Sequence, residues 1–97
     1  MPTHKELTQF LREFAKLTLE QQTLFLTAVR KMVEDLRASQ PFRPSLRVKG
    51  VKGHRGVFEM SWSGDGRATF HYGAPVRAGE AHIVWRSIGG HEIFQNP

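Results

Sequence analysis

The stretch VFEMSWSGDGRATFHY, from Val57 to Tyr72, decides the fold of this chain. Apolar and polar residues alternate on both sides of its centre, and a period of two is typical of half-buried strands. The centre itself, Gly64-Asp65-Gly66, has the composition of a hairpin turn. The sequence therefore predicts two antiparallel strands that share one apolar face and one polar face.

The length of the turn follows from the requirement that cross-strand partners lie on the same face. A two-residue loop would pair Met60 with His71, an apolar residue with a polar one. A three-residue loop pairs Met60 with Phe70 and Glu59 with His71, and it places Gly66 in the left-handed position of the turn. We therefore predict the three-residue loop. Any chemistry is expected on the polar face, which carries Glu59, Ser61, Arg67, Thr69 and His71.

Two helices are predicted in the N-terminal part of the chain. Apolar residues recur at helical spacing both before and after Thr18. Thr18 and Gln21 have the spacing of a capping box, which predicts that the second helix begins at Leu19. Because almost nothing joins the two helices, we expect an antiparallel helical hairpin over about residues 6–38.

The composition shifts from helix-forming to strand-forming after Pro41. The run LRVKGV at 46–51 predicts a first clear strand, and residues 82–88 predict a last one. With the central hairpin, these runs give three or four antiparallel strands over about residues 45–94. The first six residues are either disordered or a brief strand. We therefore predict a single α+β domain over residues 1–97, in which the helices cover the apolar face of the sheet and the polar face has no obvious cover.

Composition excludes several classes of protein. Ninety-seven residues allow one small core, and the absence of cysteine excludes disulfides and thiolate metal sites. No apolar run approaches the about 20 residues needed to span a bilayer, and the first residues lack the apolar region of a secretory signal. We expect a cytoplasmic protein that uses no membrane, no metal and no other cofactor.

The formal net charge is +5, and the positive charge is densest in the segment from Arg43 to Arg55. This segment contains no acidic residue and five basic ones, Arg43, Arg47, Lys49, Lys52 and Arg55. Such a block suits a polyphosphate or an acidic protein partner. It is equally typical of a solvated edge strand whose charges discourage edge pairing. Composition alone leaves both interpretations open.

Polar residues on and near the hairpin are candidates for chemistry, and each has a simpler alternative. Arg67 can bind a phosphate through two parallel hydrogen bonds, or it can be a surface arginine. Glu59 and His71, as predicted partners, can transfer protons near neutral pH or form an exposed ion pair. His91 follows two glycines that expose it, or it is an ordinary turn histidine.

The whole layout resembles the RelE/ParE superfamily of toxins from bacterial toxin–antitoxin modules. The order, spacing and charge of four stretches carry the resemblance: FLREFAKL-T-EQQ for the helical hairpin, LRVKGVKGHRGVFEMSW for the first strands, DGRATFHY for the next and IVWRSIGGHEIF for the end. These toxins are small basic proteins with a helical hairpin and an antiparallel sheet. The resemblance covers the chain from Phe10 to Phe94, and it implies that fold and a cognate antitoxin as a partner.

The RelE branch consists of ribosome-dependent mRNA endonucleases, which use the open sheet face. In this resemblance Arg67 matches a family arginine at the start of the strand after the turn. His91 stands where the family has a basic residue or a histidine. Phe94 stands where RelE has a tyrosine, and Glu59 and Ser61 stand where it has two lysines. The chain therefore departs from RelE itself in its acid–base groups.

Other branches use a set of glutamate, histidine and arginine instead. Attack by a ribose 2′-hydroxyl needs a base, an acid for the leaving group and cations on the phosphate. The resemblance implies catalytic roles for Arg67, His91, Glu59 and His71. It implies nucleic-acid binding by Arg47, Lys49, Lys52, Arg55 and Arg67.

The leading hypothesis is therefore a toxin that cleaves mRNA on the ribosome and is controlled by an antitoxin. One alternative is a ParE-like toxin that inhibits DNA gyrase without nuclease activity. Another is a catalytically inactive RelE-like domain that only binds a partner.

Overall fold

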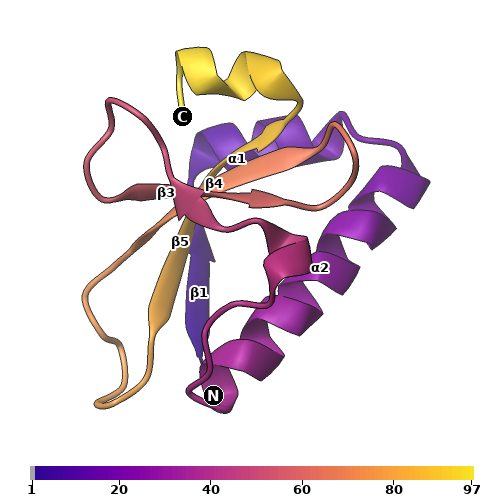
Figure 1. The fold of residues 1–97 in the computed structure, drawn as a ribbon. Helices are drawn as coiled ribbons and strands as arrows, with labels where there is room; N and C mark the ends of the chain where they lie inside the picture. The colour runs from indigo at the N-terminus through magenta and orange to yellow at the C-terminus, as the bar shows by residue number, and fades with distance from the viewer. Residues whose placement is uncertain (1) are drawn as a thin grey trace.

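The computed structural model describes residues 2–97 as two layers, with two helices packed on one face of a five-stranded sheet (Figure 1). The strand order is β1-β5-β4-β3-β2. The elements are β1 (Thr3–Glu6), α1 (Thr8–Ala15), α2 (Leu19–Arg37), the 3₁₀ helix η1 (Pro44–Leu46), β2 (Lys49–Gly50), β3 (Val57–Ser61), β4 (Arg67–Tyr72), β5 (His82–Gly89) and the 3₁₀ helix η2 (His91–Gln95).

The sheet confirms the predicted α+β class, but it is mixed rather than purely antiparallel. Strands β2 to β5 form the predicted antiparallel meander. β1 is a fifth strand, which lies parallel to β5 with Lys5 beside Val84. A parallel partner is reached only after a long crossover, which here includes both helices. The polar run THKE shows no local sign of that distant pairing.

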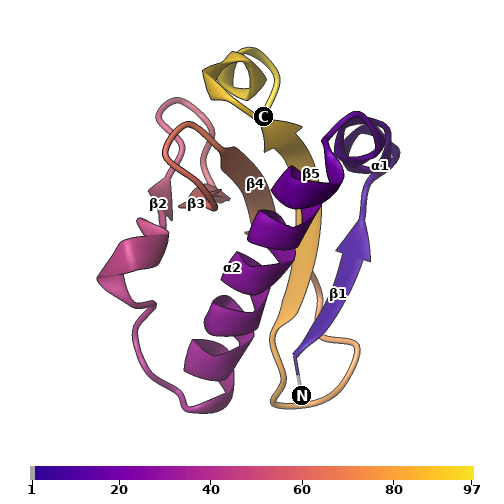
Figure 2. The same cartoon turned by 90° about the vertical axis from the view of Figure 1, so that its right-hand side faces the viewer.

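The second helix begins as predicted. The hydroxyl of Thr18 accepts a hydrogen bond from the N–H of Gln21 at 3.1 Å, and the side chain of Gln21 accepts one from the N–H of Thr18 at 2.9 Å. This capping box satisfies two otherwise unpaired N–H groups at the start of α2. The two helices lie crosswise rather than antiparallel, since Figure 2 shows α1 end-on where α2 runs lengthwise.

The central hairpin has the predicted faces, but its register is shifted by two residues. Met60 pairs with Ala68 and Glu59 pairs with Thr69, so the predicted pairing of Glu59 with His71 is wrong. A shift of two residues leaves every side chain on the same face, so the apolar–polar alternation could not distinguish the two registers. The loop between the strands therefore has five residues, 62–66, rather than three.

Side-chain and backbone hydrogen bonds close this five-residue loop. The hydroxyl of Ser63 accepts a hydrogen bond from the N–H of Gly66 at 2.8 Å, and the carbonyl of Gly66 accepts one from the N–H of Trp62 at 3.2 Å. The left-handed conformation predicted for Gly66 is wrong, because the glycines with positive φ in the described chain are Gly53, Gly56 and Gly79. Gly66 is instead required by close packing against the indole of Trp62.

The strand predicted at 46–51 is shorter than expected. Pro44 begins η1, and Arg47 ends it with a left-handed φ of 49°. Proline at the first position of a helical turn has the backbone angle that the turn requires. Only Lys49 and Gly50 remain in β2, while Leu46 is turned into the core with 2% of its surface exposed.

The core lies between the helices and the apolar face of the hairpin, as predicted. Met60 and Phe70 are fully buried, and Trp62 is 8% exposed although it lies in the loop rather than in β3. The buried cluster includes Phe10, Phe25, Ala28, Met32, Leu46, Met60, Trp62, Ala68, Phe70, Ile83, Trp85 and Ile88.

The C-terminal segment covers part of the polar face, which we had expected to lack a cover. η2 folds back against β4 and β5 (Figure 1), and Ile93 is only 4% exposed. A Cβ atom on Gly89 would lie 3.0 Å from Cγ2 of Ile93. Thr69 and Ser87 are fully buried. The part of the polar face that stays open is therefore the side formed by β2, β3 and the start of β4.

We expect Gly66→Ala to destabilise the protein. Its Cβ would lie 2.5 Å from both Cε2 of Trp62 and the hydroxyl of Ser63, so one of them must move. The free energy of unfolding, measured by urea denaturation, should fall by about 1–3 kcal/mol. Gly64→Ala is the matched control, because a Cβ there meets nothing within 4 Å. Equal destabilisation by the two substitutions would contradict this packing.

Candidate functional site

The open part of the polar face contains a hollow of about 430 Å³, which we call the catalytic hollow after the catalytic roles that are predicted for Glu59 and Arg67. It is lined by Arg47, Val48, Lys49, Glu59, Ser61 and Arg67. Three cationic side chains thus surround a single carboxylate. A cluster of this kind attracts an anion and keeps a proton acceptor beside it.

The carboxylate of Glu59 lies on β3 at the floor of the catalytic hollow. Its side chain is 12% exposed, and Oε1 lies 4.0 Å from Nζ of Lys49, the residue that pairs with it across β2 and β3. At this distance the ion pair is loose, and the Lys49 side chain is 71% exposed. Because the distance is long and the Lys49 end is exposed, the pair contributes little to stability, and Lys49 can turn to another anion at small cost.

Arg67 begins β4 and lies diagonally across from Glu59, since Arg67 pairs with Ser61. The residue is 9% exposed. Its Nη1 donates hydrogen bonds to the carbonyl oxygens of Gly66, Gly64 and Ser63 at 2.9, 3.2 and 3.4 Å. Within residues 2–97, Nε and Nη2 have no hydrogen-bond partner. The guanidinium therefore holds the loop with one nitrogen and keeps two for an anion.

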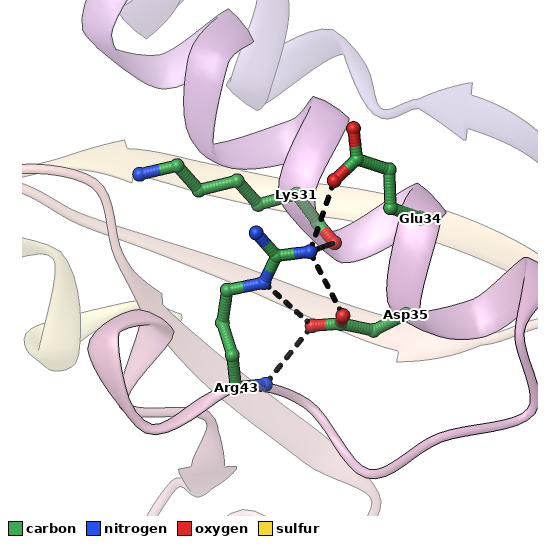
Figure 3. A network of polar contacts seen from close by, with 4 residues as sticks. All are labelled: Lys31, Glu34, Asp35 and Arg43. Atoms are coloured by element: carbon green, nitrogen blue, oxygen red, sulfur yellow. Dashed lines mark hydrogen bonds and ion pairs between the residues drawn. The ribbon is translucent and has the colours of Figure 1, made fainter.

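A network of polar contacts holds the segment that carries Arg47 (Figure 3). The guanidinium of Arg43 donates to both carboxylate oxygens of Asp35, at 3.1 and 2.9 Å, and to Glu34 at 3.0 Å. It also donates to the carbonyl of Lys31 at 3.2 Å. These bonds lower the pKa of Asp35 below its ordinary value. Arg43 is thereby removed from the basic block, because acidic residues of α2 neutralise it.

The five predicted nucleic-acid ligands divide into two groups. Arg47, Lys49 and Arg67 share the catalytic hollow. Lys52 and Arg55 are exposed in the loop between β2 and β3 and do not line it. Two glycines with positive φ, Gly53 and Gly56, lie within that loop. Binding of nucleic acid by all five residues stays a prediction.

His71 lies on the polar face away from the catalytic hollow. Its Nδ1 is 2.9 Å from Nη1 of Arg86, and Nε of Arg86 donates to the carbonyl of Pro97 at 2.9 Å. Because arginine only donates, Nδ1 of His71 must be the acceptor, and a neutral ring carries its proton on Nε2. His71 therefore contacts β5 and, through Arg86, the C-terminal segment, rather than Glu59.

Arg86 is the residue of this face that sequence reasoning missed. Thr69 pairs with Ser87 and Phe70 pairs with Trp85, so Arg86 has no partner of its own. Such a bulge re-aims a side chain within a strand. The alternation of β5 assigns no role to Arg86, and the sequence contains no signal that marks the bulge.

His91 begins η2 and is exposed, with its ring centroid 5.8 Å from that of Phe94. Gly89 pairs with Arg67, so His91 follows two residues after the partner of Arg67. His91 does not line the catalytic hollow. Its predicted catalytic role, like those of Glu59, Arg67 and His71, stays a prediction.

The part of the chain that the structure describes has neither a metal-binding cluster nor a membrane-spanning helix. Residues 2–97 contain no group of three or more histidine, cysteine, aspartate or glutamate side chains that could hold a metal ion. None of the helices described there is long and apolar enough to cross a membrane.

The comparison with known proteins rests on solved structures, because no family profile and no curated sequence matches the chain. A copper-bound mutant toxin from Helicobacter pylori is 15% identical, with a TM-score of 0.60 over 95% of this chain and 97% of that one. YafQ from Escherichia coli is 9% identical, with a TM-score of 0.60 over 95% and 96%. A RelB–RelE antitoxin–toxin complex from Methanococcus jannaschii contains a chain that is 12% identical, with a TM-score of 0.58 over 95% of each chain. The chain therefore has a RelE-like fold, as the resemblance implied.

We expect His71 to make stability depend on pH. Burial lowers its pKa, and the positive charges of Arg86 and His82 lower it further. The unfolded chain, with a histidine pKa of about 6.5, then binds the proton more readily than the folded one. The stabilising effect is present above that value and is lost as the pH falls through the lower folded pKa. In urea melts from about pH 7.5 to 5, His71→Gln should flatten the fall in stability. Equal slopes for the variant and the wild type would contradict this.

Proposed function

We propose that this chain is the toxin of a toxin–antitoxin pair and cleaves mRNA on the ribosome. The RelE-like fold supports the toxin role, and one observation carries the proposed chemistry. A nearly buried carboxylate, Glu59, lies in a hollow that it shares with the cations Arg47, Lys49 and Arg67. This combination of a base with phosphate-binding groups is what cleavage of an RNA strand requires.

The reaction we propose needs no group from outside the chain and the RNA. Glu59 accepts the proton of the ribose 2′-hydroxyl as its oxygen attacks the adjacent phosphorus. The bond from phosphorus to the 5′-oxygen of the next nucleotide breaks, and His91 gives a proton to that oxygen. The products are a 2′,3′-cyclic phosphate and a 5′-hydroxyl. Phe94 lacks a hydroxyl, so the acid must be another residue, and His91 beside it is our candidate.

Arg67 has two tasks in this proposal. Its free Nε and Nη2 neutralise charge on the scissile phosphate in the transition state. Its Nη1 holds the loop that follows β3. Loss of Arg67 therefore affects both catalysis and the local fold, and a test of its catalytic role must report the folded fraction.

A cognate antitoxin is the proposed partner outside the ribosome. Two of the similar structures come from complexes named as toxin–antitoxin pairs, DinJ–YafQ and RelB–RelE. The net charge of +5 suits an acidic antitoxin as well as RNA. Binding of the antitoxin over the polar face would withhold the cations of the catalytic hollow from RNA.

The test is inducible expression in bacteria, followed by primer extension on cellular mRNA. The wild type should produce new 5′ ends in phase with codons. Glu59→Gln should lower the cleavage rate by about 10²–10⁴-fold because it removes the base. Glu20→Gln, on the exposed start of α2, makes the same chemical change outside the site and should cleave like the wild type.

The pH dependence of the cleavage rate distinguishes loss of the acid from loss of the phosphate ligand. His91→Gln should remove one limb of the pH–rate profile, whereas Arg67→Ala should lower the rate at every pH. Full growth arrest by the Arg67→Ala/His91→Gln double variant, folded and expressed at the wild-type level, would refute these roles. DNA breaks without new mRNA ends would instead favour a gyrase inhibitor, and no effect of either kind would favour a binding-only domain.

A further inference from the structure

A second hollow adjoins the catalytic hollow, and we call it the flanking hollow. It has a volume of about 340 Å³ and lies between α2, η1 and the loop after β3. Arg47 and Ser61 line both hollows, so the two are neighbours with a common wall. Two consecutive nucleotides of one strand would therefore lie close to both hollows.

The flanking hollow combines an apolar floor with hydroxyl groups. Leu46, Ala28 and Trp62 are 2%, 6% and 8% exposed, and all three belong to the core. The serines at 45 and 63 add hydroxyl groups to its wall. A small number of polar groups around an apolar floor is typical of pockets for small organic rings, and the volume is in the range that such pockets have.

Two cations make the flanking hollow suitable for an anionic ligand. Lys31 contributes from α2 and Arg47 from the end of η1. Only the carbonyl of Lys31 takes part in the Arg43 network, and its ammonium group points away from the acidic residues there (Figure 3). Across residues 2–97 this ammonium group has no hydrogen-bond or ion-pair partner. Arg47 holds the uncommon left-handed backbone at the wall that the two hollows share.

Trp62, one of the lining residues, carries an unsatisfied donor. Its Nε1 is buried and has no hydrogen-bond partner. Most buried N–H groups in folded proteins are paired, so each exception needs an explanation. A hydrogen-bond acceptor brought by a ligand is one way to satisfy this N–H group.

We propose that the flanking hollow is a nucleotide pocket for single-stranded RNA. It receives the base of the nucleotide next to the scissile phosphate against Leu46, Ala28 and Trp62, while Lys31 and Arg47 bind the phosphate of that nucleotide. The inference rests on the proposed function, because it assumes that RNA occupies the catalytic hollow. A flat base suits the apolar floor, and its phosphate suits the cations at the wall.

The probe is a trinucleotide of RNA whose 2′-oxygens are methylated, so that it binds but cannot be cleaved. In ¹H–¹⁵N spectra the indole N–H of Trp62 should shift and saturate as the trinucleotide is added. The indole of Trp85 is the internal reference, because Trp85 packs against Phe25 on the far side of the core and does not line the flanking hollow. The measurement needs no catalytic activity, so it stays informative if the nuclease proposal fails.

A charge variant tests the phosphate contact. Lys31→Gln should weaken binding of the trinucleotide and should lower the slope of log K against log salt concentration by about 0.7, the value for one lost contact with a single strand. Arg30→Gln is the matched control, because it removes one charge from the next position of α2 and does not line the hollow.

The inference is overturned if the Trp62 signal stays in place, or if Lys31→Gln binds as Arg30→Gln does. It is also overturned if polyglutamate shifts the Trp62 signal and the trinucleotide does not, because the hollow would then accept an acidic protein segment. Cleavage of mRNA with an unmoved Trp62 signal would refute this pocket and leave the proposed function intact. A saturable Trp62 shift with the expected loss in Lys31→Gln, without cleavage, would support the pocket and refute the nuclease.

Discussion

Burial of the apolar face of the β3–β4 hairpin beneath the two helices is the constraint on which the rest of the structure depends. Phe70 and Met60 are fully buried there, and Phe70 packs edge-on against Trp85 with 5.4 Å between ring centroids. In a strand, successive side chains point to opposite faces. Burial of one set therefore directs Glu59 and Arg67 to the opposite face. The polar composition of the open face is a geometric consequence of how the core is packed.

Some basic side chains of the molecule form ion pairs that stabilise the fold, whereas others line a hollow at the surface. Arg43 has the most acidic surroundings, and its bonds to Asp35 and Glu34 tie the connector after α2 to that helix. Arg47, four residues later, is left at the surface of both hollows. Arg43 is thus neutralised, whereas Arg47 and Lys49 of the same block line the hollow beside the carboxylate of Glu59. A block of positive charge in the sequence is thus divided between a residue that anchors the connector and residues that line the hollow.

The polar face is itself divided by the C-terminal segment. η2 packs against β4 and β5, where Thr69 and Ser87 are fully buried, and Arg86 links His71 to the end of the described chain. What remains open is the part beside β2, where the short strand leaves room for a hollow. The catalytic hollow lies on this open part, and no residue of η2 lines it.

The sequence by itself determined the α+β class, the start of α2 and the composition of both faces of the hairpin. Each depends on local periodicity or on a motif within four residues, as in the capping box of Thr18 and Gln21. Tertiary structure alone decided the register of the hairpin, because a shift of two residues leaves both faces unchanged. It also decided the parallel pairing of β1, the withdrawal of Arg43 by α2 and the bulge that turns Arg86 toward His71. These features arise from contacts between residues far apart in the chain, and a local sequence pattern does not predict such contacts.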